Sequence, residues 1–173
     1  MARLVEAMAP APTADPPAIP ETAVIAVGAD HGGFSLKQKL VFRLREQGHI
    51  VNDCGTHSAE PVDYPDIAAA VADLVAAGSA SAGIVIDGAG VGSAMAANKV
   101  AGVRASLCYD VSSARNARRH NHANLLTLGA GLIGDALAWE IVEAWLATPW
   151  EEGRHARRVE KIDALERRIP VLR

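Results

Sequence analysis

Five short apolar runs, separated by longer stretches with helical periodicity, constrain the fold of this sequence most strongly. The runs are VIAVGA (24–29), HIVNDC (49–54), GIVID (83–87), VRASLC (103–108) and NLLTLG (124–129). Helical patterns are expected over residues 33–47, 65–78, 92–99, 111–119, 133–147 and 154–167. Strands that are apolar on both faces and alternate with helices pair in parallel, with helices covering the sheet. The pattern therefore predicts a doubly wound α/β domain.

The domain organisation follows from length and composition. The chain has 173 residues, of which 50% are hydrophobic, and this is enough for one substantial core. Residues 9–20 (APAPTADPPAIP) are rich in proline and nearly uncharged, which is typical of an extended spacer. We therefore expect a disordered, Pro-rich N-terminal extension over residues 1–22 and one folded domain over residues 23–168.

The first eight residues, MARLVEAM, place Leu4, Val5 and Met8 at helical spacing. Two interpretations follow. Residues 1–8 are either a disordered tail or a docking peptide that becomes helical on a partner, such as the inner surface of a protein shell that packages enzymes.

Several protein classes are excluded by composition. No apolar run approaches the roughly 18 residues of a membrane span, and no secretory signal is visible, so we expect a cytoplasmic protein without a membrane partner. The net charge of -3 gives no basic field for nucleic acid. Cys54 and Cys108 lie in or beside apolar segments, which argues against a disulfide and gives Cys108 no catalytic role.

Ligands of doubly wound sheets bind at the carboxyl ends of the strands, so the residues after each run deserve inspection. The third run ends in Asp87 and continues into GAGVGS (88–93), where Gly88, Gly90 and Gly92 would let the backbone approach an anion closely. A tight strand-to-helix turn would use the same glycines, so the loop alone decides nothing.

Two further groups of polar residues stand out. Asp30 and His31 follow the first run, either as ligand contacts or as a helix cap beside an exposed histidine. His120 and Asn121 precede the fifth run, in a segment that could also be a solvated loop.

In the last helical pattern Arg154 and Arg158 are four residues apart, hence on one face, with His155 beside them. Paired guanidinium groups suit a phosphate. Together the polar groups indicate a small phosphorylated ligand with several hydroxyls. No motif for a cofactor, a metal or an activated serine accompanies them, so we expect neither cofactor nor metal.

Several segments carry a family resemblance. They are VGADHGGFSLKQKL, DCGTHSAEPVDYPDIA, GIVIDGAGVGSAMAANKVAGVRA, SARNARRHNHANLLTLG and GRHARRVEKI. Over residues 23–166 the chain resembles the ribose-5-phosphate isomerase B family, which also includes the galactose-6-phosphate isomerase subunits. The resemblance implies a Rossmann-like three-layer sandwich with a five-stranded parallel sheet. It also implies a homodimer or tetramer with shared active sites, in which the C-terminal helix reaches the partner subunit.

The activity that the resemblance implies is the cofactor-free interconversion of a phosphorylated aldose and ketose through an enediolate. Position by position, the implied catalytic residues are Asp87, His120 for ring opening, and Asn121 for the enediolate. The implied sugar contacts are Asp30, His31, Tyr64, Gly88, Gly90, Val91, Gly92 and Ser93. The implied phosphate contacts are Arg154, His155 and Arg158, contributed by the other subunit.

The sequence departs from the family pattern at four positions. Asp87 stands where many members have a cysteine base, and Ser93 stands where another branch has a glutamate. Ala89 replaces the usual hydroxyl residue, and Gly131 replaces a common arginine. We expect Asp87 to be the general base, with a pKa raised by burial. The alternative is an aspartate that only accepts amide hydrogen bonds from its own turn.

The leading prediction is therefore an isomerase that converts ribose 5-phosphate to ribulose 5-phosphate. An isomerase of another tetrose, pentose or hexose phosphate is the first alternative. A non-catalytic sugar-phosphate-binding subunit is the second. A nucleotide-binding module is the third, with Asp53 as its ribose-binding acid.

Overall fold

All five apolar runs are strands of one parallel sheet in the computed structural model, which describes residues 18–167. The strands are β1 (Val24–Ala29), β2 (Ile50–Asp53), β3 (Ala82–Asp87), β4 (Ala105–Leu107) and β5 (Leu125–Gly129). Their order in the sheet is β2-β1-β3-β5-β4, and every neighbouring pair is parallel. The predicted α/β fold is confirmed. The proposed docking peptide and most of the spacer lie outside the described residues.

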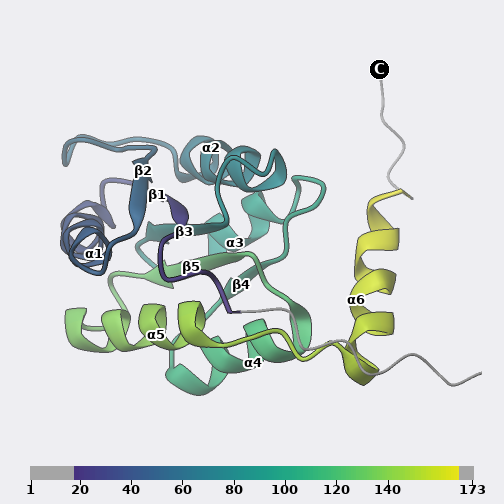
Figure 1. Ribbon diagram of the computed structural model, residues 1–173. Coiled ribbons are helices and arrows are strands. Elements are labelled where there is room, and N and C mark those ends of the chain that lie inside the picture. The colour runs from purple at the N-terminus through teal and green to yellow at the C-terminus, as the bar shows by residue number, and fades with distance from the viewer. Residues whose placement is uncertain (1–17, 168–173) are drawn as a thin grey trace, which may run out of the picture.

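Helices cover both faces of this sheet (Figure 1). They are α1 (Phe34–Glu46), α2 (Tyr64–Ala76), α3 (Val91–Ala97), α4 (Val111–Asn121), α5 (Asp135–Ala147) and α6 (Gly153–Glu166). One core cluster joins the sheet to α1, α4 and α5, and a second joins it to α2 and α3. Each helix begins and ends within two residues of its predicted bounds. None of these helices combines the length and apolar character that a membrane span needs.

The central strand β3 is buried along its whole length. Its side chains alternate between the two faces, so that Ile84 and Ile86 pack with α1 and α5 while Val85 packs with α2. In the pairing with β5, Asp87 lies opposite Gly129. Asp87 therefore ends a fully buried strand, at the edge of the sheet where the strands finish, which we call the carboxyl edge. The edge where the strands begin is the amino edge.

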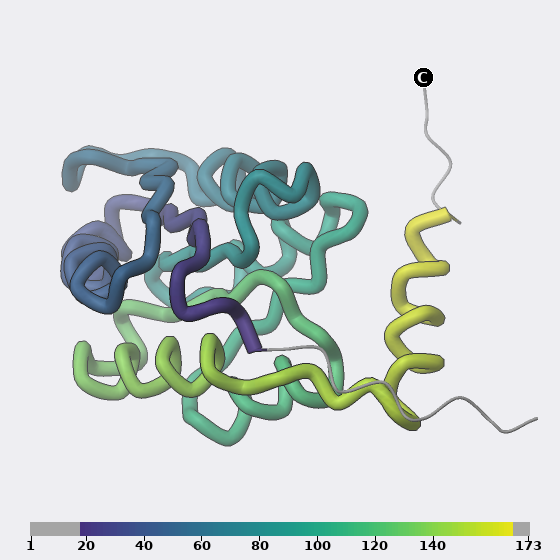
Figure 2. The backbone as a smooth tube through the Cα atoms, viewed as in Figure 1, coloured from purple at the N-terminus to yellow at the C-terminus, as the bar shows by residue number. Residues whose placement is uncertain are grey.

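The last helix, α6, stands away from the sheet and follows the connection from α5 (Figures 1 and 2). It is tied to the body by an ion pair of 2.9 Å between Arg104 and Asp163. Ile162 and Leu165 on this helix are exposed, by 44% and 52%. An amphipathic helix that leaves apolar side chains open in one chain is suited to contact a second chain.

Candidate active site

Asp87 is held by the loop that follows it. One carboxylate oxygen, Oδ1, accepts hydrogen bonds from the amides of Ala89, at 2.7 Å, and Gly90. The other, Oδ2, accepts from the Ser93 amide at 3.1 Å and from the Ser93 hydroxyl at 2.5 Å. Asp87 is only 5% exposed and Ser93 is fully buried. The carboxylate therefore anchors the 88–93 loop and the start of α3.

The expectation of a raised pKa for Asp87 is wrong. Burial is the largest single influence and does raise the pKa, but the Ser93 hydroxyl and the three loop amides together outweigh it. The net result is a pKa below the usual value, because all four hydrogen bonds stabilise the charged form. Asp87 is thus ionised at neutral pH.

Glycines in this loop allow close packing that a side chain would prevent. Gly90 has a positive φ of 76°, and a Cβ there would lie 2.9 Å from the backbone carbon of Leu128. A Cβ on Gly92 would lie 2.5 Å from the Tyr64 ring. The loop is therefore pressed between the end of β5 and Tyr64, which brings Tyr64 to the carboxyl edge beside it.

Asp30 and His31 lie at the same edge. The Asp30 amide donates to the Ile86 carbonyl at 3.1 Å, and Asp30 Oδ1 accepts from the Gly33 amide at 3.0 Å. The buried Asp30 closes this turn, whereas the cap position of α1 belongs to Gly33. His31 is exposed, and its Nδ1 accepts from the Val62 amide at 3.3 Å. Asp30, His31, Tyr64 and the 88–93 loop form one group, which we call the carboxyl-edge group.

The structure explains why position 131 is a glycine and not the arginine common in the family. Its amide donates to the Gly88 carbonyl at 2.9 Å, and a Cβ at this position would lie 2.9 Å from the same oxygen. Tyr109 closes the other side, because its hydroxyl donates to the Ala89 carbonyl at 3.0 Å. The 88–93 loop and the turn that contains Gly131 lie too close together for any side chain at position 131. An arginine there would require the 88–93 loop to move.

His120 and Asn121 lie in the last turn of α4, which is two residues longer than predicted. After β4 this helix returns from the carboxyl edge to the amino edge, where β5 begins, and its 11 residues span about 16 Å. Within one chain, His120 and Asn121 are therefore at the opposite edge of the sheet from Asp87.

The beginning of α6 joins them there. The rings of His120 and His155 stack with centroids 4.2 Å apart and 12° between their planes. Arg154 Nε donates to His155 Nε2 at 3.3 Å, and Glu151 lies 3.9 Å from His120 Nε2. Burial is the largest cause that lowers the pKa of His155, and the guanidinium of Arg154 lowers it further. Arg158 is exposed one turn further along. We call His120, Asn121, Arg154, His155 and Arg158 the amino-edge group.

Comparison with known proteins decides the family. The family model described as Ribose/Galactose Isomerase matches residues 25–162. The chain is 49% identical over 144 residues to the ribose-5-phosphate isomerase B of Escherichia coli, which covers 83% of this chain and 97% of the relative. The chain belongs to the ribose/galactose isomerase family. As a member it is an intramolecular oxidoreductase, an aldose–ketose isomerase.

Solved structures of this family agree. The ribose-5-phosphate isomerase B of Clostridium thermocellum superposes with a TM-score of 0.83 at 46% identity, covering 84% of this chain and 98% of the other. The Mycoplasma genitalium enzyme, solved with bound ribulose-5-phosphate, superposes with a TM-score of 0.81 at 39% identity, covering 84% and 97%. The resemblance read from the sequence is confirmed.

Other polar residues of this family member have structural roles. Asp53 forms an ion pair of 2.5 Å with the fully buried Lys37, whose ammonium also donates to the Thr56 carbonyl at 2.8 Å. Asp53 is thus already committed to a buried cation, which leaves the nucleotide-binding interpretation without its acid. The pKa of His122 is lowered to about 4 by burial and by the charges of Arg104 and Arg118, so His122 is neutral.

Burial also raises the pKa of both thiols, Cys54 and Cys108, so both stay protonated at neutral pH. A protonated thiol is a poor nucleophile. The sequence did not indicate that Glu151 and Asn116 lie beside His120, or that Lys37 pairs with Asp53. Only the folded chain brings these residues together.

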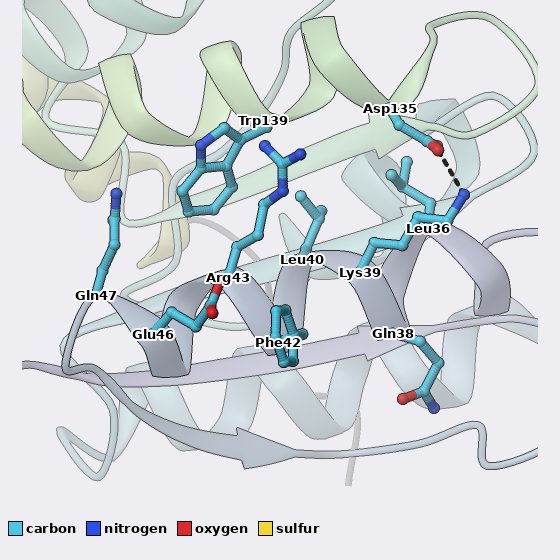
Figure 3. Close-up of a pocket in the computed structure, with 10 residues that line it drawn as sticks. All are labelled: Leu36, Gln38, Lys39, Leu40, Phe42, Arg43, Glu46, Gln47, Asp135 and Trp139. Atoms are coloured by element: carbon cyan, nitrogen blue, oxygen red, sulfur yellow. Dashed lines mark hydrogen bonds and ion pairs between the residues drawn. The ribbon is translucent and has the colours of Figure 1, made fainter.

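A surface cavity of about 750 Å³ lies on the opposite face of the sheet from α2, between α1 and α5 (Figure 3). The two helices run side by side there, with Lys39 bound to Asp135 and Arg43 stacked 5.3 Å from the centre of the Trp139 ring. No residue of the carboxyl-edge or amino-edge group lines this cavity. This cavity is therefore separate from the candidate active site.

Proposed function

We propose that this isomerase interconverts ribose 5-phosphate and ribulose 5-phosphate through an enediolate, without a cofactor. The observation that carries the proposal is the convergence of Asp30, His31, Tyr64 and the Asp87 loop at one edge of the sheet. These are the positions that the family resemblance assigns to the sugar. The names of the Escherichia coli and Clostridium thermocellum relatives support ribose 5-phosphate as the substrate.

In this proposal Asp87 is the general base, which takes a proton from the carbon next to the carbonyl and returns it to the neighbouring carbon. Three of its four hydrogen-bond donors are backbone amides fixed by the loop. The fourth is the Ser93 hydroxyl, which can rotate about its C–O bond and leave one lone pair of Oδ2 open. The position of the Ser93 hydroxyl thus determines whether Oδ2 of Asp87 is open to accept a proton. The ionised state of Asp87 at neutral pH suits proton acceptance.

The charge that develops on the enediolate needs donors. The amides of Ala89, Gly90 and Ser93 already serve Asp87, so the loop amides left for the substrate are those of Gly88, Val91 and Gly92. Amides directed at a developing oxyanion are among the strongest contributors to catalysis of this type.

The amino-edge group completes the site from a second subunit in this proposal. Its members lie at the wrong edge of the sheet to reach Asp87 within one chain. A dimer, or a tetramer built from dimers, would carry α6 and the end of α4 of one subunit to the carboxyl edge of the other. Arg154, His155 and Arg158 would then hold the phosphate, and His120 and Asn121 would reach the sugar.

The test is a panel of tetrose, pentose and hexose phosphates, assayed for aldose–ketose interconversion without added metal or nucleotide. We expect turnover of ribose 5-phosphate, and its loss in Asp87→Asn. The closed space at Gly131 favours one other candidate, an isomerase whose substrate places its phosphate elsewhere. Preferential turnover of a tetrose or hexose phosphate would establish that candidate. Binding without any turnover would identify a non-catalytic subunit instead.

A further inference from the structure

Asn116 connects the two polar residues at the end of α4. Its side-chain nitrogen Nδ2 lies 3.0 Å from His120 Nδ1. Its side-chain oxygen Oδ1 accepts a hydrogen bond of 3.2 Å from Asn121 Nδ2, which also donates to the Asn116 carbonyl at 3.4 Å. One exposed side chain therefore touches both His120 and Asn121, although nothing in the sequence pattern assigned it a role.

The chemistry of the amide determines which way each bond runs. Because Asn116 Oδ1 accepts from Asn121, the group that faces His120 is the NH₂, which can only donate. In the uncharged form of its ring, His120 must then accept through Nδ1, which places the ring proton on Nε2. Glu151 lies 3.9 Å from Nε2, where a carboxylate favours a proton. Both neighbours of the ring therefore select the same tautomer.

The arrangement is local to one helix. Asn116 and His120 are four residues apart, so they share a face of α4 and their side chains reach each other within the helix. The ring of His155 stacks on one face of the His120 ring and so restrains its plane. The orientation is thus fixed before any substrate or second subunit is present.

We propose that Asn116 is a positioning residue, which fixes His120 as the Nε2–H tautomer and turns the Asn121 amide so that its oxygen remains free. This inference rests on the proposed function. His120 then presents its Nε2–H to the sugar, where it donates a hydrogen bond to a substrate oxygen. Asn121 accepts from a sugar hydroxyl. A neutral imidazole used in this manner has precedent in enzyme-catalysed enolisation.

The direct test is nitrogen-detected NMR of the full chain labelled with ¹⁵N-histidine, at a pH where histidine is neutral. His120 is assigned by the loss of its signals in His120→Gln. We expect the Nε2–H tautomer in the unaltered protein and a mixture of tautomers in Asn116→Ala. In Asn116→Asp the carboxylate accepts a proton from the ring, so we expect Nδ1–H. Ser112→Ala, an exposed change on the same helix, is the matched control and should leave the tautomer unchanged.

Kinetics give the second readout. We expect Asn116→Ala to lower kcat about tenfold with little change in KM, because one oriented hydrogen bond is lost while the phosphate contacts stay. An Nδ1–H tautomer in the unaltered protein, or the same tautomer in Asn116→Ala, would overturn the inference. The spectra require no activity. An inactive protein with the expected tautomers would therefore refute the proposed function and leave the role of Asn116 standing.

Discussion

Replacing Asp87 with asparagine separates the two roles assigned to its carboxylate. The asparagine oxygen can keep the hydrogen bonds from the Ala89 and Gly90 amides. Its NH₂ group then takes the place of Oδ2 and faces the Ser93 amide, so that two donors oppose each other. The Ser93 hydroxyl can rotate and accept, but the amide cannot. Since Ser93 is fully buried, water cannot replace the lost acceptor.

The cost follows from these contacts. An unsatisfied buried amide costs about 2 kcal/mol, and the loss of charge from the remaining bonds adds about 1 kcal/mol. A domain of this size loses about 3 °C in Tm for each kcal/mol, so Asp87→Asn should lower Tm by about 9 °C. If Asp87 is also the base, kcat should fall by at least about a hundredfold, because an amide does not accept the proton.

Ser93→Ala is the matched control for Asp87→Asn. It removes one of the four hydrogen bonds and keeps the carboxylate, so we expect a loss of about 1 kcal/mol, or about 3 °C, and a fall in kcat well short of that in Asp87→Asn. Calorimetry and a coupled isomerase assay give both quantities on the same samples. Near-normal kcat in folded Asp87→Asn would show that Asp87 is not the general base. An unchanged Tm would refute the anchoring role.

Three further predictions concern the frame of the site. Lys37→Met should lower the free energy of unfolding in urea by about 3 kcal/mol, because it leaves Asp53 and the Thr56 carbonyl without their buried partner. The same change at the exposed Lys39 should cost less than about 1 kcal/mol, and equal losses would contradict the assignment. Gly131→Ala should reduce turnover, because the added Cβ displaces the 88–93 loop. Gly134→Ala is the control and should leave turnover unchanged, because a Cβ there meets nothing within 4 Å. Equal kinetics for the two variants would show that a Cβ at position 131 does not displace the loop. His122 has a folded pKa of about 4 against an ordinary 6.5, so the stability that it contributes is present above pH 6.5 and is lost as the pH falls toward 4. Tm measured against pH should fall less steeply over that range in His122→Asn, and parallel curves would refute this.

The fold could be read from the sequence because each element has a strong local signal. Buried parallel strands such as β3 are continuous apolar runs, and glycines or polar residues mark where they end. Edge strand β4 is shorter than the run over 103–108, because only three of those residues pair with β5. The end of α4 was misplaced, since His120 and Asn121 are polar enough to suggest a loop although they complete a helical turn.

Only part of the candidate active site could be predicted from the sequence. The sequence indicates which residues follow each strand, and so it located Asp30, His31 and Asp87 at one edge. It could not predict the direction of the Asp87 pKa, because that depends on where the Ser93 hydroxyl and three amides point after folding. Nor could it reveal the contact between Asn116 and His120, because four-residue spacing is common on any helix.

A mixed-subunit assay shows whether a sugar phosphate is isomerised at sites built from opposite edges of two chains. Asp87→Asn and His120→Gln subunits, each with its own affinity tag, are produced together, and the mixed assembly is isolated through both tags. Each mixed dimer then has one site with both changes and one with neither, so ribose 5-phosphate should be isomerised at about half the normal rate, while each variant alone is nearly inactive. A mixed assembly as inactive as its parents would show that the active site is not shared between two chains in this way.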